Sequence, residues 1–219
     1  NAAVFNAGTD LDTKRLCLQG DDILDNGGSH PNLEINCPTA NDPFAGTLPA
    51  PSSTVCDHNN QTYSGASVTI SPGVYCGWTN FNAGVNVTLN PGLYVIKGGG
   101  WNANGGDWTG VGVTFYFDDT SYLQFNSSVK VDLTAPLAGP YENIIFFEKE
   151  GLAKSNLPID DSRGFNITGI MYLPSRNLIF NGGSQQHAKE MAIVANTMIL
   201  NQTNWTLTPG DYAFGGSTT

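Results

Sequence analysis

Acidic pairs are the residues of this chain that most readily suggest chemistry. They lie at Asp21–Asp22, Asp118–Asp119 and Asp160–Asp161, and Arg163 follows the last pair. Glycosidases need two carboxylates at a set separation, and carboxylates are also the ligands that Ca²⁺ prefers. However, adjacent residues of a strand point to opposite faces, so such a dipeptide is not automatically a working pair. We therefore predict no catalytic residues, and we name Asp160, Asp161 and Arg163 as the best candidates if the chain is an enzyme.

Other catalytic and cofactor-binding motifs are missing from the sequence. The three histidines, His30, His58 and His187, are far apart, and neither H-E-x-x-H nor G-x-S-x-G occurs. The glycine runs at 98–100 and 105–106 lack the lysine of a phosphate-binding loop and a following helix pattern. We therefore expect no cofactor and no metal site.

Three tryptophans near those glycine runs form the best candidate for a binding surface. Trp78, Trp101 and Trp108 are close in sequence. If they are exposed on successive turns of the chain, they form a stacking platform for sugar rings or an adhesive patch. Packing against a lateral loop is the alternative.

Composition and charge exclude several classes of function. The chain has 219 residues with a net charge of −10, and only 13% of them are charged. Nucleic-acid binding needs clustered Lys and Arg, so we expect no nucleic-acid partner. No apolar run approaches the length of a membrane span. No basic, apolar leader is present either, so we expect any signal or anchoring segment to have been removed.

Internal repetition is the strongest structural signal. The segment Val68–Tyr75 reads V-T-I-S-P-G-V-Y, Val87–Tyr94 reads V-T-L-N-P-G-L-Y at an offset of 19, and Trp205–Tyr212 reads W-T-L-T-P-G-D-Y. A second motif, Phe-Asn, recurs at residues 5, 81, 125, 165 and 180. The 26 Gly and 23 Asn exclude a long helical bundle, because both types favour turns. Short strands in a repeat near 20 residues indicate one turn of a β-solenoid.

We accordingly predict an all-β, right-handed parallel β-helix from Gln61 to Leu207, within a region of residues 61–219. Residues 1–60 are expected to form an irregular, disulfide-bonded cap or side cover of the same domain, with short strands near 15–18 and 33–35. An antiparallel sandwich or jelly roll is the rival fold. The apolar positions of the alternating segments should point inward: Val68, Ile70, Val87, Leu89, Phe115, Phe117, Val131 and Leu133.

Eight segments in order resemble the C-terminal region of TadG-like proteins of the bacterial tight-adherence (Flp-type) pilus systems. The resemblance runs from about Cys17 to Leu207 and rests on residues 42–51, Cys56, and residues 71–77, 90–96, 110–116, 133–140, 144–147 and 169–174. Where relatives often have Gly-Gly after a paired Cys, this chain has Gly77-Trp78.

The resemblance implies a secreted or cell-surface protein of the bacterial envelope, without catalytic residues to carry over. Its expected partners are other pilus or envelope proteins, itself, or surface glycans. We therefore expect a non-enzymatic structural or adhesive protein associated with pili. The alternatives are a secreted β-helix that binds or degrades polysaccharides, and a subunit of a self-assembling secreted filament.

Four cysteines, Cys17, Cys37, Cys56 and Cys76, lack metal-binding spacing and favour two disulfides in an oxidising compartment. We predict the pairs Cys17–Cys37 and Cys56–Cys76, because each separation of 20 is close to the repeat and residues one turn apart are neighbours in a solenoid. The pairing of Cys17 with Cys76 and Cys37 with Cys56 remains the rival. The resemblance also implies two local pairs.

Overall fold

The protein is described by a computed structural model. It describes residues 3–13, 15–38, 42, 44–126, 128–160, 164–181, 185–188, 191–201 and 204–207. Of residues 160, 185–188 and 204–207 it describes the backbone only.

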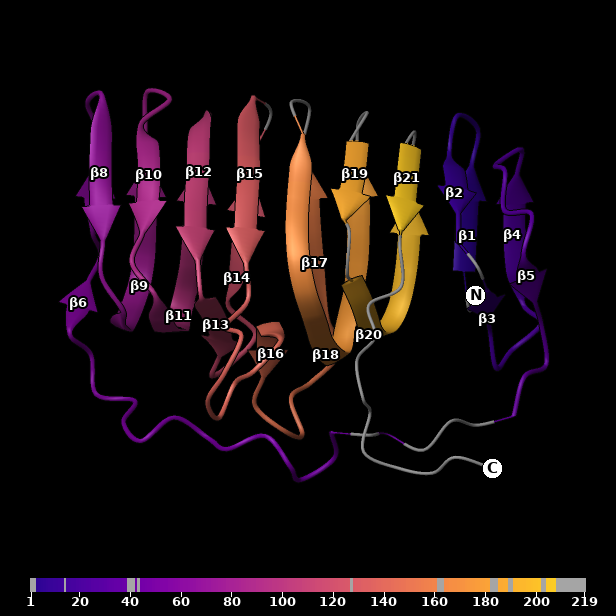
Figure 1. The fold of residues 1–219 in the computed structure, drawn as a ribbon, viewed down its shortest axis with the longest axis horizontal. Helices are drawn as coiled ribbons and strands as arrows, with labels where there is room; N and C mark the ends of the chain where they lie inside the picture. Colours follow the sequence, from indigo (N-terminus) through magenta and orange to yellow (C-terminus); the bar gives the residue numbers. More distant parts are fainter. Residues whose placement is uncertain are drawn as a thin grey trace.

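The described chain is all β-structure and winds into a parallel β-solenoid, as predicted (Figure 1). Every pairing between its named strands is parallel, which excludes the antiparallel sandwich. The strands are β1 (Ala3–Asn6), β2 (Asp10–Asp12), β3 (Leu16–Cys17), β4 (Ile23–Asn26), β5 (Leu33–Glu34), β6 (His58–Asn59), β7 (Thr62–Tyr63), β8 (Ser67–Ile70), β9 (Gly73–Phe81), β10 (Asn86–Leu89), β11 (Gly92–Ala103), β12 (Gly106–Val111), β13 (Val113–Phe117), β14 (Tyr122–Phe125), β15 (Val129–Thr134), β16 (Ile144–Glu148), β17 (Ser155–Asp160), β18 (Phe165–Asn181), β19 (Gln185–Ala188), β20 (Met191–Leu200) and β21 (Asn204–Leu207).

The repeat in the sequence sets the register between turns. β10 lies beside β8 with Val87 opposite Val68 and Leu89 opposite Ile70. All eight residues that we predicted to point inward belong to the main apolar core or pack against it. Equivalent side chains therefore stack along the axis at the spacing of neighbouring strands, about 4.8 Å.

Aromatic rings fill the centre of the solenoid. Tyr75, Tyr94, Phe115 and Phe146 stack on one another through successive turns, with ring centroids 5.2–6.3 Å apart. The ring of Trp101 meets Tyr94 and Phe115 edge-on. Such offset and edge-to-face contacts add to the stabilisation that burial of the rings provides.

The repeated Pro-Gly corner also stacks between turns. Gly92 has φ 138°, which a residue with a side chain rarely adopts. A Cβ atom placed on Gly92 would lie 2.5 Å from Cγ of Pro72 in the turn below. The corner therefore needs glycine both for its backbone conformation and for the close approach of the proline.

The N-terminal segment extends the far end of the solenoid. β1 pairs with β20 on one side and with β4 on the other, and β2 pairs with β21. In Figure 1 the indigo strands of the N-terminus stand beside the yellow strands of the C-terminal turns. The short strands expected near residues 15–18 and 33–35 are present as β3 and β5, whereas β1, β2 and β4 were not predicted. The predicted limits, Gln61 to Leu207, thus leave out the strands within residues 3–34.

A long connection returns the chain from this end to the other. Its described part from Phe44, which contacts Tyr172 of β18, passes under several turns of the solenoid to β6, as the purple trace in Figure 1 shows. We call residues 42–57 the strap; residue 43 lies outside the described chain. First and last turns are therefore linked twice, through the winding of the chain and through the strap.

Candidate functional site

The candidate acidic site lies largely outside the described residues. Asp160 ends β17, where its backbone pairs with Asn181 of β18. Asp161 and Arg163 belong to the part of the chain that the structure does not describe. The prediction about these three residues therefore stays a prediction.

The three tryptophans do not form a common platform. Trp101 and Trp108 are fully buried in the core, and only Trp78 is exposed, at 41%. The prediction is wrong for Trp101 and Trp108, because both rings point into the solenoid, where they pack on Phe81. Trp78 packs edge-on against Tyr122, with ring centroids 5.5 Å apart, and the two rings form a small aromatic patch.

A buried ion pair is the main feature that sequence reasoning missed. Arg176 is fully buried, and its Nε donates to Oε2 of Glu148 at 2.8 Å. The other Glu148 oxygen accepts hydrogen bonds from the backbone N–H and the hydroxyl of Ser175. No motif marks this pair, because the two residues lie 28 positions apart and meet only through the stacking of β16 on β18.

The remaining Arg176 donors hold the turn between β13 and β14. Nη1 donates to the backbone carbonyl of Thr120 and to the Ser155 hydroxyl, and Nη2 donates to the carbonyls of Asp119 and Ser121. All five N–H groups of the guanidinium thus have acceptors within the protein. Because no donor is left to bind an anion, the arrangement anchors structure instead of binding a ligand.

The carboxyl of Asp119 in the same turn is also held by hydrogen bonds. Burial acts to raise its pKa, but hydrogen bonds from Ser121 and Gly98, together with the Arg176 charge, outweigh burial and lower it. The hydrogen bonds of the folded turn therefore stabilise the charged form of the Asp119 carboxylate.

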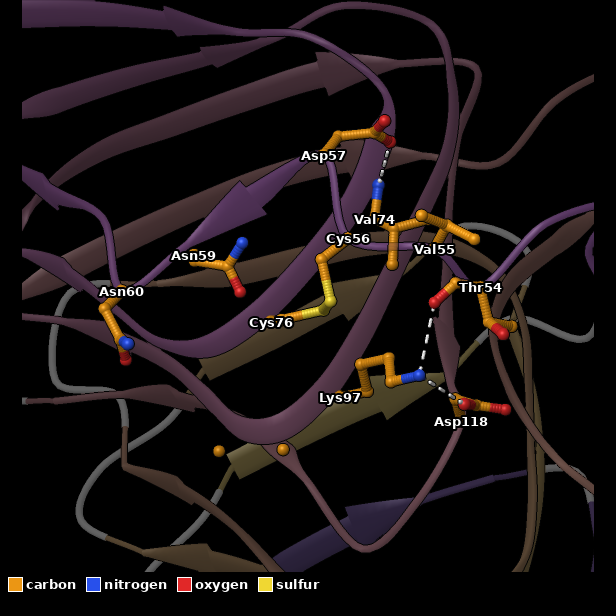
Figure 2. Close-up of a disulfide and its surroundings, with 12 residues drawn as sticks. Thr54, Val55, Cys56, Asp57, Asn59, Asn60, Val74, Cys76, Lys97 and Asp118 are labelled. Atoms are coloured by element: carbon orange, nitrogen blue, oxygen red, sulfur yellow. Dashed lines mark hydrogen bonds and ion pairs between the residues drawn. A yellow bond between two sulfur atoms is a disulfide. The ribbon is translucent and has the colours of Figure 1, made fainter.

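Both predicted disulfides are present, and they fix the two ends of the long connection. Cys17 pairs with Cys37 at a Cα–Cα distance of 6.0 Å, and Cys56 pairs with Cys76 of β9 at 5.7 Å. Cys37 precedes the strap. Cys56 lies near its end, where Figure 2 shows it bonded to Cys76. The two disulfides therefore indicate an oxidising environment, and they attach the connection at opposite ends of the solenoid.

The strap covers an apolar stripe on the outside of the solenoid. This stripe is a second buried cluster that includes Val74, Val95, Tyr116, Phe147, Ile170 and Tyr172. Phe44 of the strap packs edge-on against Tyr172, whose hydroxyl donates to Asp42 at 2.6 Å. The strap therefore lies over apolar surface that water would otherwise meet.

Polar contacts hold the end of the strap near the second disulfide (Figure 2). The Asp57 carboxylate accepts from the backbone N–H of Val74 at 2.8 Å. Lys97 Nζ donates to the Thr54 carbonyl at 3.2 Å and lies 3.5 Å from Asp118. Main chain, side chain and disulfide thus all fix this end of the strap to β9 and β11.

The sheet face built from β8, β10, β12, β15 and the start of β18 is open to solvent (Figure 1). Thr69, Thr88 and Thr109 are exposed neighbours in register on this face. The row continues through Asp132 to Asn166, which donates to Asp132 at 3.1 Å. We call this row, from Thr69 to Asn166, the polar row.

One cluster of metal-ligand types occurs among the described residues, at Cys17, Glu34 and Cys37. Both sulfurs are bonded to each other in the disulfide, so they are not available as thiolate ligands. Within the described chain there is no helix long and apolar enough to cross a membrane.

Comparison with protein-family models, with curated proteins and with solved structures gave no match to this chain.

Proposed function

We propose that this protein is a non-enzymatic structural or adhesive protein of a bacterial surface, and that it acts in association with Flp-type pili. The observation that carries the proposal is the connection between Cys37 and Cys56, which contains the strap and has a disulfide at each of its two ends. A scaffold held in this way resists unwinding from its ends, where a solenoid is weakest. The sequence resemblance to TadG-like proteins supports the pilus association.

The polar row supplies a surface for adhesion in this proposal. Its residues are exposed and lie in register on successive strands, and they are not part of the apolar stripe under the strap. The guanidinium of Arg176, which is fully buried, already has all of its donors occupied within the protein. Both features fit a protein that presents a surface and performs no chemistry.

The proposal is tested by deleting the gene in the bacterium that carries it and counting pili and attached cells. We expect fewer attached cells, with recovery when the wild-type gene is restored. Restoring a gene with Thr88→Lys and Thr109→Lys should return the folded protein without attachment, whereas Thr62→Lys, an exposed change outside the polar row, should behave as wild type. Normal attachment after deletion would contradict the proposal.

Glycan binding is a second candidate function, because Trp78 and Tyr122 form an aromatic patch at the surface. Exposed aromatic rings with one apolar face suit stacking against sugars. Binding to an array of bacterial and host glycans, lost in Trp78→Ala, would favour this candidate. Release of sugars from a polysaccharide by the purified protein would instead favour the alternative of a polysaccharide-degrading enzyme.

A further inference from the structure

The turn at the β8 end of the solenoid has a free edge on each of its three strands. In the described part of the chain, β6 and β7 pair only with β9, and β8 pairs only with β10. Figure 1 shows β6 and β8 at one end of the stack. Residues 57–72, which form this turn, are all described. This end therefore presents strand edges that no strand of the described protein covers.

The apolar core is also incompletely covered at this end. Tyr63 stacks on Phe81 with ring centroids 5.2 Å apart, and Val68 lies in register with Val87. Phe81 and Val87 are buried, whereas Tyr63 and Val68 are only partly buried, although all four belong to or pack against the same core. The difference arises because each layer of a solenoid is covered by the next turn. A partner on this end would therefore cover apolar side chains as well as strand edges.

The two ends of the solenoid differ in charge. Natural sheets protect their free edges with charged residues or proline. In the terminal turn at the opposite end, residues 15–34 include four acidic residues and one arginine. At the β8 end, β6, β7 and β8 contain no Asp, Glu, Lys, Arg or Pro. The nearby Asp57 carboxylate already accepts the N–H of Val74. In a chain with a net charge of −10, two copies can therefore meet at this end without like-charge repulsion.

A single two-fold rotation pairs all three free strands. β6 lies beside the first part of β9 and β7 beside its last part, while β8 occupies the remaining face. A two-fold axis through the middle of β8 and between β6 and β7 places β8 against β8 of a second copy, and β6 against β7. The two short strands match in length, because each has two residues. Such a self-complementary contact closes at the dimer.

We propose that two copies of this protein form a closed dimer through this end, with their β8 strands paired antiparallel. The backbone of β8 defines the register. The carbonyls of Ala66 and Ile70 point to β10, where they accept hydrogen bonds from backbone N–H groups at its two ends. Alternate residues of a strand direct their backbone groups to the same neighbour. The backbone groups of Ser67 and Thr69 therefore point to the free edge.

In the register that follows, Ser67 of one copy lies opposite Thr69 of the other, and the two exchange N–H···O=C hydrogen bonds in both directions. Val68 lies on the two-fold axis, opposite its counterpart in the second copy. Val68 is only partly buried in the single chain, whereas Ile70 is already buried. This register therefore covers the apolar side chain that the single chain leaves exposed, and it keeps the exposed side chains of Ser67 and Thr69 on the outer face.

Sedimentation equilibrium of the full chain, from about 1 µM to about 1 mM, tests the proposal. We expect a monomer–dimer equilibrium, with amide hydrogen exchange at Ser67 and Thr69 slowing as the dimer forms. A monomer throughout this range would overturn the proposal. Species that grow beyond the dimer would show head-to-tail stacking and would overturn the closed contact. Slow exchange at both amides in the dilute monomer would show that another part of the same chain covers the edge, with the same consequence.

Thr69→Pro removes an N–H that faces the free edge and leaves the backbone groups that face β10. The dimer dissociation constant should rise about tenfold or more, because two hydrogen bonds are lost per dimer. Thr69→Ala is the matched control: it keeps the N–H and should dimerise like the wild type. An unchanged dissociation constant in a folded Thr69→Pro variant, checked by circular dichroism, would overturn the proposal.

A cross-link provides an arm that does not depend on the proline variant folding. In the dimer, the two copies of residue 68 form a pair without backbone hydrogen bonds, whose Cα atoms lie about 4.5 Å apart, which suits a disulfide. Val68→Cys should therefore link two copies under oxidising conditions. Val111→Cys, at an exposed valine of β12, is the control and should remain a free thiol. No link at residue 68, or equal linking of both variants, would overturn the proposal.

Discussion

The side chain of Asn6 donates a hydrogen bond to the side chain of Asn201, 195 residues later in the chain. Asn201 in turn donates to Asn181 at 2.6 Å, and Asn26 donates to Asn6 at 2.8 Å. One continuous ladder of asparagine amides therefore crosses the junction between the C-terminal and N-terminal turns. Such a ladder satisfies polar side chains at the same corner of each turn, so the first strand is built into the stack as a regular layer.

Replacing Arg176 with Met should destabilise the protein by about 3–5 kcal/mol, because Glu148 is left as a buried charge without its partner. Thermal or urea unfolding measures this loss. Arg15→Met is the matched control: Arg15 pairs with Glu34 at 2.7 Å, but both side chains are more than half exposed. In this control the free energy of unfolding should fall by about 0–1 kcal/mol. Equal, small effects of both changes would contradict the anchoring role of Arg176.

Removing the second disulfide, as Cys56→Ser with Cys76→Ser, should lower the free energy of unfolding by about 3 kcal/mol, since it closes a loop of about 20 residues. Amide exchange in residues 54–57 should rise, because that end of the strap is then held only by hydrogen bonds. Unreduced peptide mapping checks the pairing itself. A fragment linking Cys37 to Cys56 would contradict it.

Trp101→Ala should cost about 3–5 kcal/mol, because the fully buried ring is surrounded by aromatic neighbours that cannot fill its space. The change Trp78→Ala removes a ring that is 41% exposed. It should cost less than about 1 kcal/mol. Chemical denaturation measures the free energy of unfolding of both variants. A large decrease for Trp78→Ala with none for Trp101→Ala would contradict the assignment of Trp101 to the core and Trp78 to the surface.

Buried tyrosines should make the fold sensitive to strong alkali. Burial raises the pKa of Tyr75 and Tyr94 well above the usual value, and burial with the nearby Asp118 charge raises that of Tyr116 to about 12. An unfolded tyrosine ionises near pH 10. The stability from keeping these hydroxyls neutral is therefore complete below about pH 10 and is lost as the pH rises through the folded values.

Tyrosinate absorbance and far-ultraviolet circular dichroism, followed together in an alkaline titration, test this expectation. The buried fraction of tyrosines should ionise only as the β-structure is lost. Ionisation of all tyrosines near pH 10 with the β-structure intact would contradict their burial.

Local repeats made the solenoid predictable. The V-T-I and V-T-L segments fixed both the register of β8 with β10 and the inward positions, because identical patterns stack most easily on one another. The disulfide pairs followed from the same period. Turn lengths vary elsewhere, however, so the spacing alone did not show that Trp101 and Trp108 point inward.

The junction of the two chain ends was harder to predict. Phe5-Asn6 repeats the motif of Phe180-Asn181, and this was the one signal that β1 belongs to the stack. Nothing in a linear pattern states that a first strand pairs with the last turn. The Arg176–Glu148 pair could not be predicted for the same reason. Its two residues are 28 positions apart and meet only in the folded structure.

The pairing of β1 with β20 is the central structural claim, and an engineered disulfide tests it most directly. Val4 lies opposite Ile199 in this pairing, and both side chains are partly exposed. Neighbouring strands lie about 4.8 Å apart, which suits a disulfide. The variant Val4→Cys with Ile199→Cys should therefore form an intramolecular bond, identified by unreduced peptide mapping. Val4→Cys with Ile179→Cys, one turn further away, should not. Free thiols in the first variant, or bonds only between molecules, would contradict the account.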